Sequence, residues 1–295
     1  MTASGVRCCL VLLALAACGE PSDPNAIPEA RIVFRREALL YSMRPDGTDQ
    51  RRISPPVDSG PLGPIAWLLP VSNAAGTRIA FEYDGDIRTL TPAGTGLTNV
   101  TSDGFVTPEL WPSWSPDGER LAYDNGVVDG ADIFVMDTHG GQRVRVTTNP
   151  ADDREPAWAP DGSRIAFTSS RDSGYGIYTI APSGEQPRRI TPYSVTAVAP
   201  IWSPAGDMIA FFGYDSVGQG LYVIGADGGG LRELAGTYNG YGRATWSPDG
   251  KRLAYSANVG QQSKIFVING DGTNLSVLSP PEAADYDPAW VPAGR

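Results

Sequence analysis

Histidine and cysteine are nearly absent from this sequence, which limits the chemistry that it can perform. Its 295 residues include one histidine, His139, and three cysteines. His139 lies in a predicted turn at residues 137–140, where a polar residue serves the turn itself. A Ser-His-Asp hydrolase lacks its parts, because there is no second histidine and no Gly-x-Ser-x-Gly motif. A histidine or cysteine metal site is equally unsupported. We therefore predict no catalytic residue, no metal ligand, no cofactor and no enzymatic activity.

Long hydrophobic runs are also scarce. The run near the N-terminus covers residues 8–17, and at ten residues it is too short to span a bilayer but suits a signal-peptide core. It follows Arg7 and ends in Leu15-Ala16-Ala17-Cys18-Gly19, which resembles the lipobox of bacterial lipoproteins. That resemblance implies a signal peptide at 1–17 and a lipid (palmitate-type acyl chains) on Cys18. The alternative is an ordinary signal peptide with a coincidental cysteine.

Cys18 is the only cysteine that this cleavage would leave, since Cys8 and Cys9 belong to the leader. A disulfide within the mature monomer is then excluded. Residues 18–30 contain three prolines and predict an extended tether. Because several acyl chains anchor a protein stably, and Gly19 resembles an outer-membrane sorting signal, we expect attachment to the periplasmic side of the outer membrane.

Positive charge is in deficit. The chain has 23 Lys and Arg against 33 Asp and Glu, a formal net charge of −10. Such a surface repels nucleic acid and anionic lipid. We expect a monomer with no nucleic-acid partner that touches the membrane through its N-terminal lipid.

A repeat organises the rest of the chain. Tryptophans recur at intervals of 47, 44, 44, 44 and 44 residues, and most are followed by a Ser-Pro-Asp-Gly type turn; they are Trp67, Trp114, Trp158, Trp202, Trp246 and Trp290. Short apolar runs such as 121–123 and 133–136 follow each turn, which is the pattern of stacked four-stranded β-units. After Trp67 we expect the turn to be stretched over residues 68–76. Each unit should end in a fourth strand, for example at 144–147 or 188–191.

The two ends of the chain complete one unit. Residues 31–34 and 39–42 match a second and a third strand with no Trp strand before them, whereas Trp290 begins a unit with nothing after it. Sharing a unit between the termini removes an open sheet edge. The sequence therefore predicts an all-β, six-bladed β-propeller over residues 31–295, closed by strands from both termini.

The repeated Trp-Ser-Pro-Asp-Gly followed by Leu-Ala-Tyr, at Trp114 and Trp246, resembles the WD-repeat-like propeller repeats of the TolB family, and covers 31–295. TolB itself has an α/β domain before its propeller, for which the tether leaves no room, so the resemblance implies a TolB-like lipoprotein form without that domain. Peptidase relatives that share the repeat append a hydrolase domain, which we do not expect here. The resemblance implies a fold more than a function.

A propeller of this kind presents two faces. The turn face carries the turns between strands one and two and between strands three and four, which are nearly uniform; the loop face carries the other connections, which differ in sequence. Rigid scaffolds place recognition on such loops, and Tyr and Arg are common at binding hot spots. The candidate partner-binding residues are Arg154, Glu155, Tyr175, Tyr214, Tyr241, Arg243, Tyr286 and Asp287. Trp111 lies outside the Trp register and is a candidate exposed contact.

These features predict a cell-envelope lipoprotein whose propeller is a non-catalytic binding or scaffolding module for proteins, peptides or glycans. The alternative is a propeller enzyme that acts on a carbohydrate or lactone with a calcium ion in the central channel. Acidic pairs such as Asp152-Asp153 offer oxygen ligands, but none has the spacing of a known calcium loop. Several carboxylates or amides converging in the channel would favour the enzyme.

Overall fold

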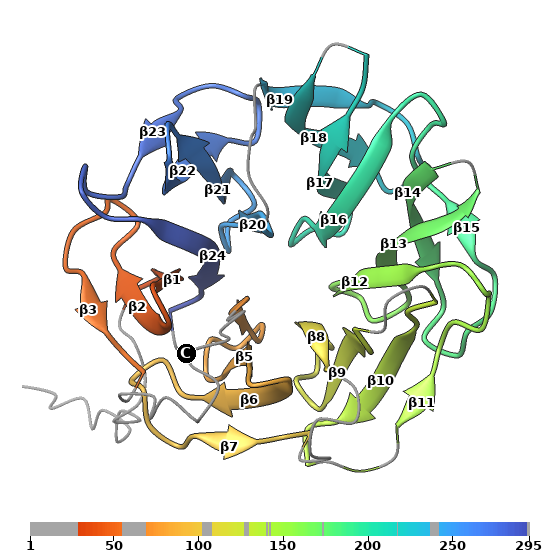
Figure 1. The fold of residues 1–295 in the computed structure, drawn as a ribbon, viewed down its shortest axis with the longest axis horizontal. Helices are drawn as coiled ribbons and strands as arrows, with labels where there is room; N and C mark the ends of the chain where they lie inside the picture. Colours follow the sequence, from red (N-terminus) through yellow and green to blue (C-terminus); the bar gives the residue numbers. More distant parts are fainter. Residues whose placement is uncertain are drawn as a thin grey trace, which may run out of the picture.

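A computed structural model describes residues 29–54, 69–101, 108–126, 130–139, 141, 143–172, 174–216, 218–236 and 242–293. Every regular element in these ranges is a β-strand, and the strands form six four-stranded antiparallel sheets arranged as a ring (Figure 1). The predicted six-bladed β-propeller is confirmed. The described residues contain no helix long and apolar enough to cross a membrane. The predicted leader, Cys18 and most of the tether lie outside the described residues.

The first three blades, each given from its innermost strand outward, have the following bounds. Blade 1 is β24 (Asp285–Val291), β1 (Arg31–Arg36), β2 (Leu39–Met43) and β3 (Arg51–Arg52). Blade 2 is β4 (Val71–Ser72), β5 (Ile79–Tyr83), β6 (Asp86–Leu90) and β7 (Thr98–Asn99). Blade 3 is β8 (Leu110–Trp114), β9 (Arg120–Asp124), β10 (Ile133–Asp137) and β11 (Val144–Arg145).

The other three blades follow the same order. Blade 4 is β12 (Asp153–Trp158), β13 (Ile165–Asp172), β14 (Gly174–Ile180) and β15 (Arg188–Arg189). Blade 5 is β16 (Thr196–Trp202), β17 (Met208–Tyr214), β18 (Gln219–Gly225) and β19 (Arg232–Gly236). Blade 6 is β20 (Thr245–Trp246), β21 (Arg252–Val259), β22 (Gln262–Asn269) and β23 (Ser276–Val277).

Blade 1 is shared between the termini, as expected. In β24 Trp290 lies opposite Ile32 of β1, just as Trp158 lies opposite Ile165 in blade 4. The tryptophan that begins each hairpin therefore keeps the same register in the shared blade. Closure by both termini is confirmed.

The prediction for Trp67 was wrong. Ser72 lies opposite Ile79, so it occupies the position that Trp114 holds opposite Leu121. The turn after it is not stretched: Gly76 donates to the carbonyl of Asn73 at 3.0 Å, as Gly118 donates to that of Ser115 at 2.9 Å. The Asn73 side chain accepts the backbone N–H of residues 77 and 78, so an asparagine does the work that serine does in other blades. Trp67 itself lies outside the described residues.

The fourth strands of most blades are shorter than predicted. β11 and β15 cover two residues each. One further backbone hydrogen bond follows each strand, from the N–H of residue 146 or 190, and the next contact with the third strand is made by a side chain. Thr147 Oγ1 accepts the N–H of Ile133 at 2.9 Å, and Thr191 Oγ1 accepts that of Ile177 at 3.0 Å. A hydroxyl from residue 54, 101 or 279 does the same in blades 1, 2 and 6. The short edges limit the unpaired backbone that the rim exposes.

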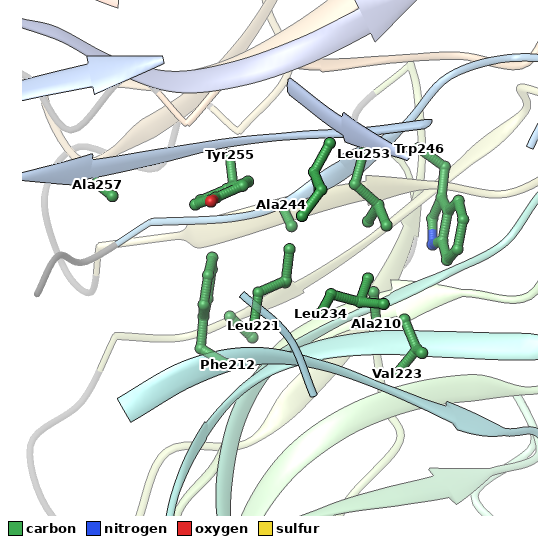
Figure 2. Close-up of a cluster of buried hydrophobic side chains, with 12 residues drawn as sticks. Ala210, Phe212, Leu221, Val223, Leu234, Ala244, Trp246, Leu253, Tyr255 and Ala257 are labelled. Carbon is green, nitrogen blue, oxygen red and sulfur yellow. The ribbon is translucent and has the colours of Figure 1, made fainter. Parts of the chain in front are cut away.

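The hydrophobic core lies between neighbouring blades rather than at one centre. Figure 2 shows the contact of blades 5 and 6, where Phe212 and Leu221 face Tyr255 and Leu253, and Trp246 closes one end. Equivalent clusters fill the other gaps, for example Trp158 with Ile133 and Phe167 between blades 3 and 4. Each blade thus supports its neighbours, which holds the innermost strands at fixed positions around the central channel.

Candidate binding surfaces and the central channel

The innermost strands bend toward the channel at a repeated position, three residues before the tryptophan. This position is held by Trp111, Glu155, Ala199, Arg243 and Asp287, which are spaced by 44 residues. Backbone φ is positive at four of them, from 52° to 58°, and the strand pairing shifts register there. Such a β-bulge re-aims side chains. Three predicted site residues, Glu155, Arg243 and Asp287, therefore belong to one ring of channel positions.

Arg243 closes the channel. It starts beside β20 in blade 6 and donates from Nη1 to the carbonyl of Pro112 at 2.7 Å, and from Nη2 to those of Trp111 and Pro156 at 3.3 and 3.4 Å. β20 and β8 lie on opposite sides of the central opening (Figure 1). The guanidinium also lies 5.2 Å from the centre of the Trp111 ring. One side chain thus joins blade 6 to blades 3 and 4 across the ring.

Arg243 and Asp287 are not on the exposed surface where the sequence pattern had placed them. Their exposed fractions are 5% and 6%. The bulge turns the Asp287 side chain inward, where it forms an ion pair with Arg35 at 3.0 Å. Arg243, where φ is not positive, extends into the channel to the carbonyl of Pro112. Trp111, expected as an exposed contact, is half-buried beside Arg243.

Buried carboxyl groups surround the Arg243 guanidinium. Burial raises the pKa of Glu82 to about 9, with Asp124, Asp287 and Glu109 adding negative charge nearby. Burial likewise raises the pKa of Asp124 to about 7, although Asp124 accepts the Glu155 N–H at 3.0 Å. Burial lowers the pKa of Arg243 to about 10 against the opposing field of Glu155, Asp124 and Asp287. The cluster is buried and carries its own counter-cation.

Glu155 is held by blade 5 as well as by its own blade. Its Oε2 accepts the Thr168 hydroxyl at 2.5 Å and the Ala199 N–H at 2.7 Å, and burial raises its pKa. Among the described residues no group of three or more His, Cys, Asp or Glu side chains is placed to hold a metal ion.

On the turn-face side of Arg243 the channel widens into a funnel of about 380 Å³. Its wall is a ring of Trp and Pro side chains, namely Trp114, Trp158, Trp202, Trp246, Trp290, Pro116, Pro160, Pro204, Pro248 and Pro292. Arg243 is the only ionisable residue among the described residues that line it. The funnel is thus an apolar recess with one guanidinium at its floor.

The other predicted residues lie on the loop face in separate groups. Arg154 and the Tyr175 hydroxyl both contact Asp152, each at 3.4 Å. In blade 1 the Cζ atom of Arg35 lies 4.0 Å from the centre of the Tyr286 ring. Tyr214 is half-buried at the end of β17. Tyr241 lies outside the described residues.

Sequence reasoning missed Glu82, Asp124, Arg35 and the channel role of Trp111. A signal for the ring was present, because four of the five residues at the 44-residue spacing precede a proline, at 112, 156, 200 and 288. The exception is Arg243, which precedes Ala244. Counting the period at this position, rather than at the turn, identifies the channel lining.

Six four-stranded blades around a channel that Arg243 crosses define a six-bladed β-propeller. The described residues include no built metal centre. Residues 98–294 match the model of the TolB beta propeller domain family. That match spans more than half of the sequence, and the chain belongs to this family.

Known proteins with the same fold include TolB itself. A stretch of 92 residues is 34% identical to a Protein TolB homolog of Chlorobium luteolum, and it spans 31% of this chain and 20% of that protein. TolB from Acinetobacter baumannii superposes with a TM-score of 0.75 at 21% identity, over 90% of this chain and 67% of its own. A putative TolB from Agrobacterium tumefaciens gives 0.68 at 19% identity, over 90% and 91%.

The fold likeness extends to a propeller enzyme. An oligogalacturonate lyase in complex with manganese superposes with a TM-score of 0.58 at 12% identity, over 81% of this chain and 69% of its own. Likeness at these identities concerns the fold alone.

Proposed function

We propose that this chain is a non-catalytic binding or scaffolding module of the cell envelope. A lipid on Cys18 tethers it to the periplasmic side of the outer membrane, and the loop face of the propeller binds protein, peptide or glycan partners. The leader and lipobox-like sequence support the location, and the family supports a binding role. The loop-face residues of the proposal are Arg154, Tyr175, Tyr214, Tyr241 and Tyr286. The other predicted residues, Glu155, Arg243 and Asp287, belong to the channel behind that face.

The observation that carries the non-catalytic part is the closed channel. Arg243 lies beside the buried carboxyls Glu155, Asp124 and Asp287, and its two Nη groups donate to three backbone carbonyls. A general acid or base must come within hydrogen-bond reach of the reacting group. The funnel offers none among its described lining residues, since its only ionisable group is a guanidinium.

The loop face has the features that recognition requires. Arg154 and Tyr175 converge on Asp152, and Tyr286 stacks with Arg35, so aromatic and cationic groups are held before a partner arrives. Tyr and Arg in such settings are common hot-spot residues.

The test is capture of envelope proteins by immobilised protein that starts at residue 19, followed by binding measurements with the purified partner. We expect Arg154→Ala with Tyr175→Ala to weaken binding by more than about 1 kcal/mol per anchor. The matched control is Asp161→Ala with Ser183→Ala, two exposed turn-face residues, which should leave binding unchanged. Loss of the partner by the turn-face variant and retention by the loop-face variant would overturn the face assignment.

A further inference from the structure

Blade 4 contains an alternating series of aromatic rings and guanidinium groups that ends at the surface. Arg171 lies 5.1 Å from the centre of the Phe167 ring and 4.9 Å from that of Tyr178. Arg189 lies 5.6 Å from the Tyr178 ring and 4.2 Å from the Tyr193 ring. The order is therefore Phe167, Arg171, Tyr178, Arg189 and Tyr193. Each cation is attracted by the negative faces of the rings beside it.

Each arginine of the series is fixed by its own carboxylate. Asp153 accepts two hydrogen bonds from Arg171 Nη2, at 2.9 and 3.0 Å. Asp172 lies 3.7 Å from Arg189. The Arg189 side chain further donates to the carbonyl of Thr191 at 2.9 Å and to the Tyr178 hydroxyl at 3.3 Å. Both positive charges are thus neutralised locally and held in place.

The backbone leaves room for Arg189 because residue 176 is glycine. A Cβ at Gly176 would lie 2.6 Å from Arg189 Cζ, closer than non-bonded carbon atoms approach, so another residue there would displace the guanidinium. The guanidinium lies between Gly176 of β14 and the Tyr193 ring. Its orientation is set before any ligand arrives.

Tyr193 is the outer end of the series, and its position is also fixed. It follows Pro192 in a turn whose ends are joined by a 3.4 Å hydrogen bond from the Val195 N–H to the carbonyl of Pro192. Val195 is 5% exposed and belongs to the core between blades 4 and 5. Yet the Tyr193 side chain is 69% exposed, the highest value among the exposed large hydrophobic residues that the structure describes. One ring face covers Arg189 and the rest of the ring is open to solvent.

We propose that the open face of Tyr193 binds an arginine or lysine side chain of a protein partner. The series alternates ring and cation, so a cation is the group that continues it. Charge favours the same choice, because the Asp172 carboxylate lies 3.4 Å from the Tyr193 hydroxyl and the chain carries a net charge of −10. A partner's cation would therefore meet a ring face and a carboxylate together. This inference names the partner chemistry for the loop face and rests on the proposed binding function.

The test uses two fluorescent peptides that differ in one respect: Gly-Arg-Gly-Arg-Gly and the same sequence with citrulline at both arginine positions. Citrulline keeps the shape and removes the charge. At about 150 mM salt, where long-range attraction is screened, we expect the full mature protein to bind the arginine peptide about three- to tenfold more tightly than the citrulline peptide. Equal affinity for the two peptides would overturn the proposal.

Variants of Tyr193 locate the effect. Tyr193→Phe keeps the ring face and should retain the preference for arginine, whereas Tyr193→Ala should abolish it. Val259→Ala, a change at another exposed apolar side chain, is the control and should behave as the unaltered protein. Retention of the arginine preference by Tyr193→Ala would assign it to another site. Thermal unfolding of each variant checks the fold, since Tyr193 lies outside the core.

The two proposals fail in distinguishable ways. In one outcome, the captured envelope partner binds Tyr193→Ala as tightly as the unaltered protein and fails to bind Arg154→Ala with Tyr175→Ala. That result would support partner binding by the loop face and contradict the role of Tyr193. If only Tyr193→Ala fails to bind the partner, the aromatic and guanidinium series of blade 4 recognises the partner without the other loop-face residues.

Discussion

Ile32 lies directly opposite Trp290, so the second residue of β1 is paired with the tryptophan of β24. The indole is 5% exposed and packs with Ile32, Phe34 and Met43 against blade 6. Residues near the two ends of the chain therefore complete one blade, and β24 covers the inner edge of β1.

Removing this pairing should unfold the ring at lower denaturant. A chain truncated after Pro288 loses Trp290 and most of its contacts with β1. Deleting a buried tryptophan side chain alone typically costs about 3–5 kcal/mol, and the exposed β1 edge adds to the loss. Urea unfolding followed by tryptophan fluorescence measures the change.

The matched control for this truncation is a chain that ends at Ala293, which keeps all of β24. Its stability should equal that of the full chain. A truncation after Pro288 that melts within a degree or two of the control would contradict closure by β24.

Replacing Arg243 should destabilise the whole ring, although it is one side chain in a narrow channel. Arg243→Met leaves the carbonyls of Trp111, Pro112 and Pro156 without a donor and removes the cation beside Glu155. Unpaired buried polar groups cost about 1–3 kcal/mol each, so a loss of roughly 3 kcal/mol is expected. Arg154→Met, at a surface arginine that lies 3.4 Å from Asp152, is the control and should cost less than about 1 kcal/mol. Equal stability of both variants would mean that the contacts of Arg243 across the channel do not stabilise the ring.

The repeat made most of the fold predictable. Each second strand contains the expected apolar run, and Trp114, Trp158, Trp202, Trp246 and Trp290 all begin a hairpin in the same register. A period of 44 residues constrains strand order strongly, because every blade must repeat the same contacts with its neighbours. Ser72 was missed because a polar residue holds the tryptophan position there, while the unrelated Trp67 lies near the expected interval.

The candidate site was less predictable than the fold, and Arg243 illustrates why. Composition favours an exposed arginine in a loop, but Arg243 extends into the channel and donates to carbonyls of blades 3 and 4. Tyr193 is the converse case, since the Arg189 guanidinium that makes its ring a rigid platform reaches it only through tertiary packing against Gly176. Side-chain direction at bulges and turns depends on contacts that a period does not report.

Glu82 should make stability fall as pH rises. Its pKa is raised from 4.5 to about 9 in the folded chain, so the fold holds a proton that the unfolded chain releases. The stabilisation is full below about pH 4.5 and is lost as pH rises toward 9, at up to about 1.4 kcal/mol per pH unit for one proton. Glu82→Gln keeps the size and stays neutral, so this part of the slope should disappear. Chemical denaturation at a series of pH values between these limits measures it.

The control for Glu82→Gln is Glu119→Gln, at an exposed turn-face carboxyl. It should leave the slope of stability against pH as in the unaltered protein. A Glu82→Gln variant whose stability still falls as steeply would show that Asp124 and its neighbours, rather than Glu82, hold the proton.

Cys18 should decide where the protein resides in the cell. Cys18→Ser removes the thiol that the lipobox-like sequence assigns to acylation, so labelling with palmitate should be abolished and the protein should leave the membrane fraction. The described part of the chain offers no membrane-spanning helix, and a net charge of −10 opposes adsorption to anionic lipid. Cys9→Ser, which changes a thiol inside the predicted signal peptide, is the control and should keep both labelling and attachment. Persistence of the Cys18→Ser protein in membranes after a high-salt wash would reveal another anchor.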